Sequence, residues 1–137
     1  MSGYDKPLPT LTDENRPFWD ACREGVLRLQ KCGCGHLRYP IAQVCPVCLS
    51  GEFEWTAVSG RGTVFSYVVF HTAYHPGFKA DLPYNVAMVQ LAEGPRMYGS
   101  IVGVPNDAVK IGDAVEVVFD AVTPEVTIPR FRLSKEN

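Results

Sequence analysis

The sequence predicts a mainly β protein that combines one N-terminal helix, a small metal-binding ribbon and a β-barrel. Three features predict it: a helical pattern near the N-terminus, two close pairs of cysteines within residues 31–48, and strand-like alternation after residue 60. We expect three parts, namely an arm and helix over residues 1–25, a ribbon over 26–59 and a barrel domain over 60–137.

The size and composition of the chain limit the classes of function that it can have. The chain has 137 residues, of which 46% are hydrophobic and 20% are charged, and its formal net charge is −2. This allows one core with a small added module, and it excludes wholesale disorder and a strongly basic nucleic-acid arm. No apolar stretch is long enough to span a bilayer, and residues 1–10 lack a signal-peptide pattern. Together with the paired cysteines, this predicts a protein of the reducing cytoplasm that does not bind membranes.

The N-terminal region predicts an extended arm followed by a short helix. Residues 1–12 are polar and contain Pro7 and Pro9, which favour an arm over regular structure. A helix is expected from about Asp13 to Glu24, because Pro17 suits its first turn and Gly25 is a good stop.

The predicted helix carries an apolar stripe of Phe18, Trp19, Ala21 and Cys22, because positions three and four apart share a helix face. The stripe either packs on its own domain or docks on another protein, and the sequence leaves both interpretations open. The docking interpretation makes Phe18 and Trp19 partner-contact residues. Cys22 stands apart from the other cysteines and is expected to be a buried apolar thiol.

Four of the five cysteines have the spacing of a zinc site: Cys32 with Cys34, and Cys45 with Cys48. Two knuckles that each supply two thiolates can meet on one tetrahedral Zn²⁺, with about 2.3 Å between metal and sulfur. Four thiolates leave no open position, so we expect a structural zinc rather than a catalytic one. The alternatives are a reduced, metal-free set, a disulfide, or a site in which His36 replaces one thiolate.

The backbone of the ribbon is expected to be a hairpin. The first knuckle has a single residue between its cysteines, so we expect Gly33 to supply the turn that brings both side chains to one side. Residues 26–30 and 38–41 are the predicted hairpin strands, and residues 52–59 are interpreted as a link to the next domain.

The rest of the chain predicts five strands. Residues 63–71 are apolar on both faces, so this strand is expected to be central and buried on both sides. A long loop follows over residues 72–83. The other strands are expected over residues 84–91, 96–102, 114–119 and 126–133. Five short strands without a helical pattern among them indicate a small closed or nearly closed barrel, of which the five-stranded OB-fold is the leading candidate.

Several stretches form an ordered set along nearly the whole chain: Pro17-Phe18-Trp19, Tyr39-Pro40, Cys45-Pro46-Val47-Cys48, residues 60–67, Leu82-Pro83-Tyr84, residues 91–96, Ile111-Gly112 and residues 115–119. In order and spacing the set resembles the domain-of-unknown-function 35 (DUF35) family. One departure is that the first cysteine knuckle is one residue shorter than the commonest form in that family.

The resemblance implies a rubredoxin-like zinc ribbon followed by an OB-fold. It also implies an accessory, non-catalytic subunit of a thiolase-like acyl-CoA enzyme, such as an acyltransferase or an aldol-lyase that removes side chains from steroid-CoA thioesters. In such an assembly the partner supplies the catalytic residues. The small subunit scaffolds the complex and completes a channel for the acyl-CoA.

The residues themselves predict no catalytic group. The sequence has no serine-centred elbow, no Walker loop and no GxGxxG motif after a strand. His71, His75 and Asp81 lie in or beside the 72–83 loop, but no activated nucleophile accompanies them, so we interpret them as ordinary loop residues.

The 72–83 loop is the predicted binding surface, because long loops on small barrels tend to carry binding. Tyr74, Phe78 and Tyr84 supply flat apolar area for a partner protein. His75 and Lys79 supply positive charge and are expected to contact acyl-CoA.

Two rival functions come from other classes. OB-folds bind single-stranded nucleic acid by stacking bases on strand aromatics, and Phe65 and Tyr67 are candidates for that role. The acidic balance of the chain counts against it. The second rival is an acyl-transferring or hydrolysing enzyme that acts without a partner.

Overall fold

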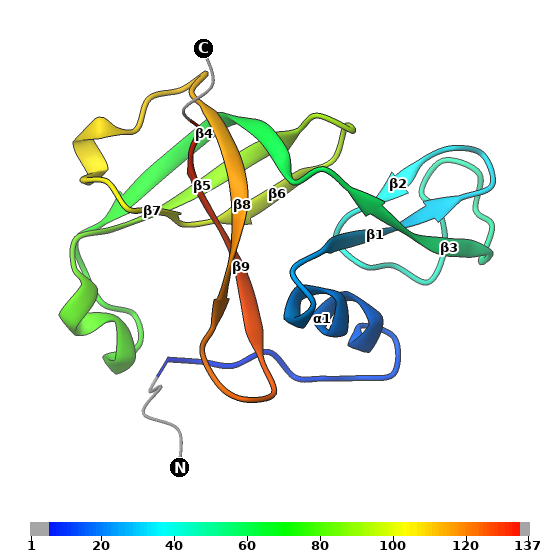
Figure 1. Ribbon diagram of the computed structural model, residues 1–137, viewed down its shortest axis with the longest axis horizontal. Helices are drawn as coiled ribbons and strands as arrows, with labels where there is room; N and C mark the ends of the chain where they lie inside the picture. The colour runs from blue at the N-terminus through cyan, green and yellow to red at the C-terminus, as the bar shows by residue number, and fades with distance from the viewer. Residues whose placement is uncertain (1–5, 135–137) are drawn as a thin grey trace.

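The computed structural model describes residues 6–134. A three-stranded ribbon and a six-stranded curled sheet lie at opposite ends of the molecule, and the helix α1 lies between them (Figure 1). The arm that precedes α1 runs past the β8–β9 hairpin toward the other side of the curled sheet (Figure 1).

Helix α1 spans Arg16–Arg23. It begins later than predicted because residues 12–15 form a turn in which the Asn15 side chain accepts from the Thr12 backbone N–H at 2.8 Å. Pro17 occupies the first turn as expected, and Gly25, with φ of 80°, follows its end. Within residues 6–134, no helix is long and apolar enough to cross a membrane.

The ribbon contains three strands instead of two: β1 (Leu27–Cys32), β2 (Leu37–Arg38) and β3 (Phe53–Val58). Their order is β2-β1-β3, and both pairings are antiparallel. Residues 52–59, expected to end the ribbon and link it to the next domain, thus contain a third ribbon strand that was not predicted from the sequence. The side chains of β3 are exposed or half-buried, so its sequence lacks the alternation of buried and exposed residues that marks a strand. Backbone pairing with β1 holds it in the sheet instead.

The second sheet has the order β6-β5-β4-β8-β9-β7, with β7 parallel to β9 and the other pairs antiparallel. Its elements, with two 3₁₀ helices, are β4 (Arg61–Phe70), η1 (Pro76–Asp81), β5 (Tyr84–Leu91), β6 (Arg96–Gly99), β7 (Ile101–Val102), η2 (Asn106–Ala108), β8 (Ala114–Ala121) and β9 (Thr127–Leu133). The two end strands of this order, β6 and β7, are consecutive in the chain, so the sheet curls on itself. Within residues 6–134 no unbroken ladder closes the sheet, so of the two expected forms, closed or nearly closed, it takes the second.

The break between β6 and β7 has a local cause at Ser100. The Asn85 side-chain oxygen accepts the Ile101 N–H at 2.7 Å, and the Ser100 hydroxyl donates to the Asn85 carbonyl at 3.0 Å. Gly99 permits the bend, since a Cβ at that position would lie 2.8 Å from the Phe131 ring. The chain thus leaves β5 and joins β9 within two residues.

A single cluster of buried side chains forms the core. Strands β4–β9 contribute most of it, including Val64, Leu91 and Phe131, while α1 contributes Phe18 and Cys22. The ribbon residues Leu27 and Leu29 belong to the same cluster. Cys22 is fully buried, as predicted for an apolar thiol.

Strand β4 corrects a second expectation. It is central in the strand order, between β5 and β8, but Val64 is its only buried side chain. Phe65 and Val68 are 45% and 55% exposed. The apolar pattern of this strand therefore does not reflect burial on both sides.

Candidate functional site

The ribbon brings the four predicted metal ligands together: Cys32, Cys34, Cys45 and Cys48. All four sulfur atoms lie within 4.8 Å of one another, with 3.2 Å between those of Cys32 and Cys48 and 3.7 Å between those of Cys34 and Cys45. A tetrahedral site with metal–sulfur distances of about 2.3 Å has sulfur–sulfur edges of about 3.8 Å. The cluster therefore fits a four-thiolate metal site. All four thiols are free in the structure, and His36 lies outside the cluster.

The short first knuckle can place Cys32 and Cys34 on the same side because β1 ends at Cys32. The residues that follow no longer alternate from side to side as they would in a strand. The Gly35 N–H donates to the Cys32 carbonyl at 2.9 Å, and the Cys32 N–H donates to the His36 carbonyl at 2.9 Å. Gly35, with φ of 94°, provides the left-handed conformation. The expectation that Gly33 supplies it is wrong, because the positive φ lies at Gly35.

The second knuckle is closed by its own backbone. The Leu49 N–H donates to the Cys45 carbonyl at 2.9 Å, and the Cys45 N–H donates to the Ser50 carbonyl at 2.8 Å. The Val47 N–H points at the Cys45 sulfur at 3.4 Å, which favours a thiolate there.

Proton affinities in the cluster are uneven. The backbone N–H of Cys34, followed by the Cys48 thiol, lowers the pKa of Cys32 to about 6. The hydrogen bond with Cys32 raises the pKa of Cys48 to about 12. The opposite shifts belong to two sulfurs 3.2 Å apart that share one proton, and a metal ion bound by both would displace that proton.

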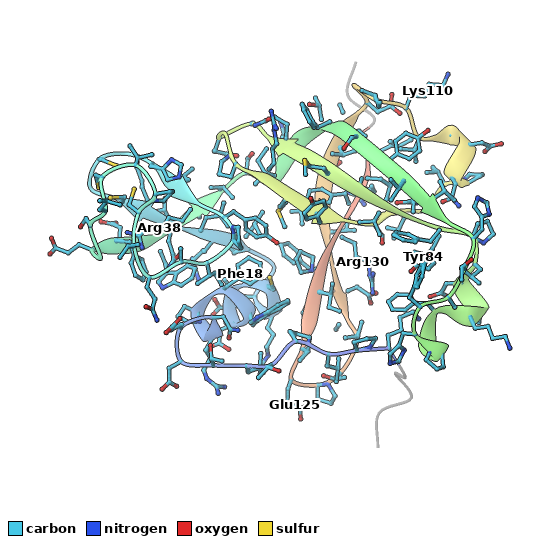
Figure 2. The ribbon with its side chains drawn as sticks, turned by 180° about the vertical axis from the view of Figure 1, so that it is seen from behind. Phe18, Arg38, Tyr84, Lys110, Glu125 and Arg130 are labelled. Atoms are coloured by element: carbon cyan, nitrogen blue, oxygen red, sulfur yellow. The ribbon has the colours of Figure 1, made fainter. Side chains whose placement is uncertain are left out.

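A second site lies on the curled sheet, where the predicted aromatic residues gather. The Tyr84 ring stacks on Phe70 at 5.1 Å and on Phe78 at 5.0 Å between centroids, and Tyr74 meets Phe70 edge-on at 6.1 Å. Figure 2 shows Tyr84 beside η1, the helix that carries Phe78. Tyr74 is 80% exposed, so this aromatic ladder presents apolar surface to solvent.

His75 and Lys79, the two residues predicted to supply positive charge, lie in different environments. His75 caps η1: its Nδ1 accepts the Gly77 N–H at 2.9 Å, and its ring meets Phe78 edge-on. Lys79 lies on η1 itself and is exposed. Of the five residues in and beside this loop that were predicted to bind, Phe78 and Tyr84 line the cleft described next, and so does Asp81, which was interpreted as an ordinary loop residue.

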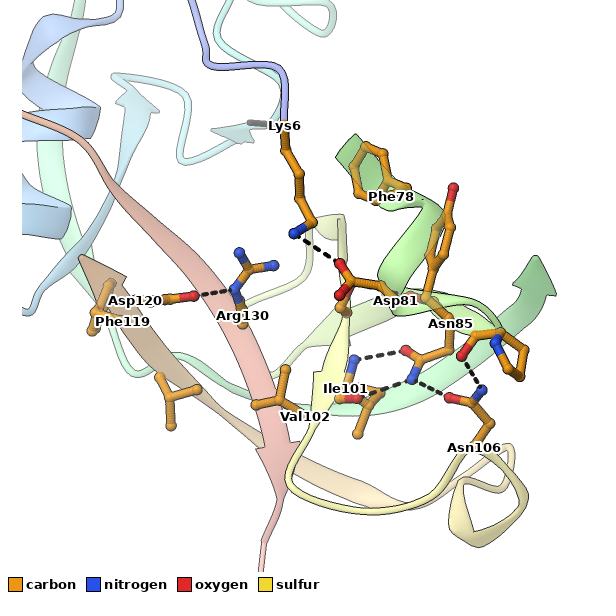
Figure 3. A pocket seen from close by; sticks show the side chains of 14 residues that line it. Lys6, Phe78, Asp81, Asn85, Ile101, Val102, Asn106, Phe119, Asp120 and Arg130 are labelled. Atoms are coloured by element: carbon orange, nitrogen blue, oxygen red, sulfur yellow. Dashed lines mark hydrogen bonds and ion pairs between the residues drawn. The ribbon is translucent and has the colours of Figure 1, made fainter. Parts of the chain in front are cut away.

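A cleft of about 630 Å³ opens beside this ladder, between η1, β7 and the β8–β9 hairpin (Figure 3). Two ion pairs occupy its walls: Lys6 Nζ lies 2.8 Å from Asp81, and Arg130 Nε lies 2.8 Å from Asp120. Apolar surface from Phe78, Tyr84, Ile101, Val102 and Phe119 completes the lining.

One wall of the cleft is held in place by two amides. The buried Asn85 side chain donates to the Ile101 carbonyl and to Asn106 Oδ1, both at 2.9 Å, and the Asn106 amide donates to the Pro83 carbonyl at 3.0 Å (Figure 3). These bonds fix β5, β7 and η2 relative to one another. The cleft is thus pre-formed, with an apolar wall and two cations that are each paired with a carboxylate.

Sequence reasoning missed Lys6 and Arg130. They come from the arm and from the last strand, and no local motif links them to the 72–83 loop. The described cleft residues include no cysteine, no histidine and no serine paired with a base, so the cleft contains no nucleophile–base pair.

The apolar stripe of α1 packs mainly against the core of its own chain. Phe18 is only 4% exposed, meets Trp19 edge-on at 5.0 Å and lies near Tyr39, so it faces inward and has no surface for a partner. The prediction of Phe18 as a contact residue is corrected on this point. Trp19 is half-buried and lines a shallow groove with Tyr39 and Ile41.

Comparison with known proteins identifies both parts of the chain. The profile described as the ChsH2 rubredoxin-like zinc ribbon domain matches residues 19–54, and that of the ChsH2 C-terminal OB-fold domain matches residues 55–120. A solved structure described as "Ltp2-ChsH2(DUF35) aldolase" contains a chain that is 35% identical. It superposes with a TM-score of 0.82, over 92% of this chain and 98% of that one.

Several known proteins are also similar to this chain in sequence. A "DUF35 domain-containing scaffold protein" of Methanothermobacter thermautotrophicus is 41% identical over 93 residues, which are 67% of this chain and 69% of that protein. A "Probable enoyl-CoA hydratase alpha subunit" of Thermomonospora curvata is 38% identical over 130 residues. The match spans 93% of this chain but 40% of that longer protein.

The "Benzoylsuccinyl-CoA thiolase subunit BbsA" of Thauera aromatica is 30% identical over 89 residues, which are 65% of this chain and 59% of that protein. Both domains, their order and the four cysteines therefore agree with the resemblance found in the sequence. The chain belongs to the DUF35 family, with the zinc ribbon and OB-fold domains of the ChsH2 type.

Proposed function

We propose that this chain is an accessory subunit of a thiolase-like acyl-CoA enzyme, in which the partner carries out the chemistry. The observation that carries the proposal is its match, over nearly its full length, to the ChsH2 chain of an aldolase assembly. Relatives named as subunits of a thiolase and of a hydratase support the same role. The lack of a nucleophile–base pair among the described cleft residues is consistent with it.

The reaction that best fits is carbon–carbon bond cleavage of an acyl-CoA thioester, with steroid side chains as the preferred substrate class. A relative from Mycobacterium tuberculosis that is 35% identical is named as a 3-oxo-4,17-pregnadiene-20-carboxyl-CoA hydratase alpha subunit, which supports a steroid thioester. In this proposal the small subunit completes the channel and orients the thioester, while the partner polarises and cleaves it.

The partner is proposed to bind through the aromatic ladder and the adjoining outer sheet face. Tyr74, Phe78 and Tyr84 supply the ladder side, and Trp19 forms a separate contact near the ribbon. The exposed Val68 and Tyr98 extend the apolar surface over β4 and β6. A patch of this kind on a small domain marks a protein interaction site.

Acyl-CoA is proposed to enter the cleft next to this surface. Its phosphates would bind Lys6 and Arg130 in exchange for their carboxylate partners, while His75 and Lys79 contact the outer part of the ligand. The acyl and pantetheine parts would lie along the apolar wall formed by Phe78, Ile101 and Val102.

The four cysteines are proposed to hold one structural Zn²⁺. Two buried and two exposed thiols at tetrahedral spacing support zinc, which four sulfur ligands favour. The ion would join the two knuckles and set the ribbon against α1. Free thiols at this spacing need reducing conditions, which is why we place the protein in the cytoplasm.

Co-purification tests the subunit proposal. The tagged chain is expected to retain a thiolase-like protein from its native host, and Tyr74→Ala combined with Phe78→Ala is expected to abolish this. Ile111→Ala serves as the control, because Ile111 is 69% exposed on a turn outside the ladder and the cleft. Equal recovery of the partner by the double variant and the control would exclude the ladder as the docking surface.

Nucleic-acid binding is the alternative from another class. A fluorescence titration with single-stranded oligonucleotides at moderate salt is expected to show no submicromolar binding, because the chain is acidic overall. The Arg96 guanidinium also lies 3.8 Å from the centre of the Phe65 ring and covers one of its two faces.

A further inference from the structure

Arg38 is a buried cation in the ribbon that lacks a carboxylate partner. It is 1% exposed and is among the largest fully buried side chains of the protein. No acidic side chain within residues 6–134 pairs with it, and its Nε has no hydrogen-bond partner. Burial of a guanidinium without an anion is unfavourable unless something in the ribbon compensates its charge.

The hydrogen bonds of Arg38 all go to one segment. Its terminal nitrogens donate to the carbonyls of Ala42, Ser50 and Glu52, each at 3.0 Å, and its guanidinium lies 5.0 Å from the centre of the Phe53 ring. Figure 2 labels Arg38 within the three-stranded ribbon.

These carbonyls flank the second cysteine knuckle on both sides. Ala42 precedes Cys45, while Ser50 and Glu52 follow Cys48, and the Ser50 carbonyl also accepts the Cys45 N–H at 2.8 Å. Arg38 therefore ties both ends of the knuckle to strand β2. Its cross-strand neighbour Gln30 adds one bond of the same kind, since Gln30 Oε1 accepts the Ala42 N–H at 2.8 Å.

The metal site would supply the negative charge that Arg38 has no carboxylate to provide. Four thiolates around one divalent ion carry a net charge of −2. Among the other cations of the ribbon region, Lys31 is exposed and Arg28 is paired with Glu24. Arg38 is the buried cation in the described ribbon, and its guanidinium remains charged over the pH range in which thiolates bind metal.

We infer that Arg38 is the positioning residue of the four-thiolate metal site. Its three carbonyl bonds hold the second knuckle in the ligand geometry, and its charge compensates the anionic cluster. The inference depends on the proposed metal site and does not depend on the partner enzyme. Residues that orient metal ligands typically change metal affinity 10- to 100-fold when they are replaced.

Three substitutions separate the two contributions. Arg38→Met keeps the approximate length of the side chain and removes both the charge and the bonds. Arg38→Lys keeps the charge but loses the planar fork. Gln30→Met is the matched control, because it removes a buried bond to the same loop without changing any charge.

Competition titration of Co²⁺ and Zn²⁺ against a chromophoric chelator measures the affinity, and the Co²⁺ absorption spectrum reports the ligand set. Wild-type protein is expected to show a tetrahedral four-thiolate spectrum. Arg38→Met is expected to bind about 10- to 100-fold more weakly with the same type of spectrum, Arg38→Lys to lie in between, and Gln30→Met to show the smallest loss.

Two results would overturn the inference. One is Arg38→Met binding metal as tightly as wild type. The other is an equal loss of unfolding free energy in Arg38→Met with metal bound and with metal removed by chelator, which marks a purely structural residue. If Arg38→Met does not fold, the affinity of Arg38→Lys relative to Gln30→Met decides. If wild type itself binds no Co²⁺ through thiolates, the metal assignment fails, and this differs from a failure of Arg38 alone.

Discussion

Lys6 Nζ lies 2.8 Å from the Asp81 carboxylate and 5.7 Å from the centre of the Phe78 ring. The pair ties the N-terminal arm to η1 across one wall of the cleft. The arm therefore forms part of the cleft wall, although it lies far from η1 in the sequence.

Lys6→Glu is expected to weaken acyl-CoA binding by about tenfold, because it replaces a charge-assisted contact to phosphate with repulsion. Folding stability should change by less than about 1 kcal/mol, since both side chains are partly exposed. Isothermal titration with an acyl-CoA checks this, with Lys31→Glu on the ribbon as the control. Equal affinity for the two variants would remove Lys6 from the site.

Cys45→Ser is expected to reduce the metal content from about one Zn per chain to near zero, because the site loses a buried ligand. The ribbon should loosen while the curled sheet persists. Metal analysis and the fluorescence of Trp55, which lies on β3, report the two effects. Cys22→Ala is the control, since Cys22 lies outside the cluster and should leave the metal content unchanged.

Ionisation of the buried Cys22 thiol is expected to lower the folding stability of the protein at high pH. Burial raises the pKa of its thiol from 9.0 to about 12, so the neutral form is favoured in the folded state. The stabilisation is complete below about pH 9 and is lost as the pH rises toward 12. Urea unfolding at increasing pH should show a smaller alkaline loss in Cys22→Ala than in wild type. An identical pH profile would show that the thiol does not contribute.

Gly99→Ala is expected to destabilise the protein by about 1–3 kcal/mol, because the new Cβ would lie 2.8 Å from the Phe131 ring in a packed core. Gly33→Ala is the matched control: its Cβ would meet nothing within 4 Å and its φ is not positive. Urea unfolding measures both. A stability loss no greater than that of the control would show that the close approach of β6 to Phe131 is tolerant.

The sequence was sufficient for features that depend on local spacing. The cysteine pairs, the stop at Gly25 and the strands 84–91 and 126–133 follow from patterns within a few residues, and the structure places them close to the predicted bounds. The four-thiolate cluster was predictable for the same reason, because metal geometry restricts ligand spacing.

Features that depend on distant contacts were not predictable. The split at Ser100 comes from the Asn85 side chain on another strand, and β3 is a strand because β1 pairs with it. The cleft joins Lys6 and Arg130, which share no motif. Arg38 resembled any other surface cation in the sequence, and only the fold reveals that it is buried.

The division of labour between this chain and its partner is tested most directly by acyl-CoA turnover. The measurement compares the purified chain, the purified thiolase-like partner and their mixture with the same steroid-CoA thioester. Cleavage is expected in the mixture, with a rate that falls when Tyr74→Ala and Phe78→Ala are combined, and none is expected from this chain alone. Turnover by the isolated chain at the rate of the mixture would contradict the account.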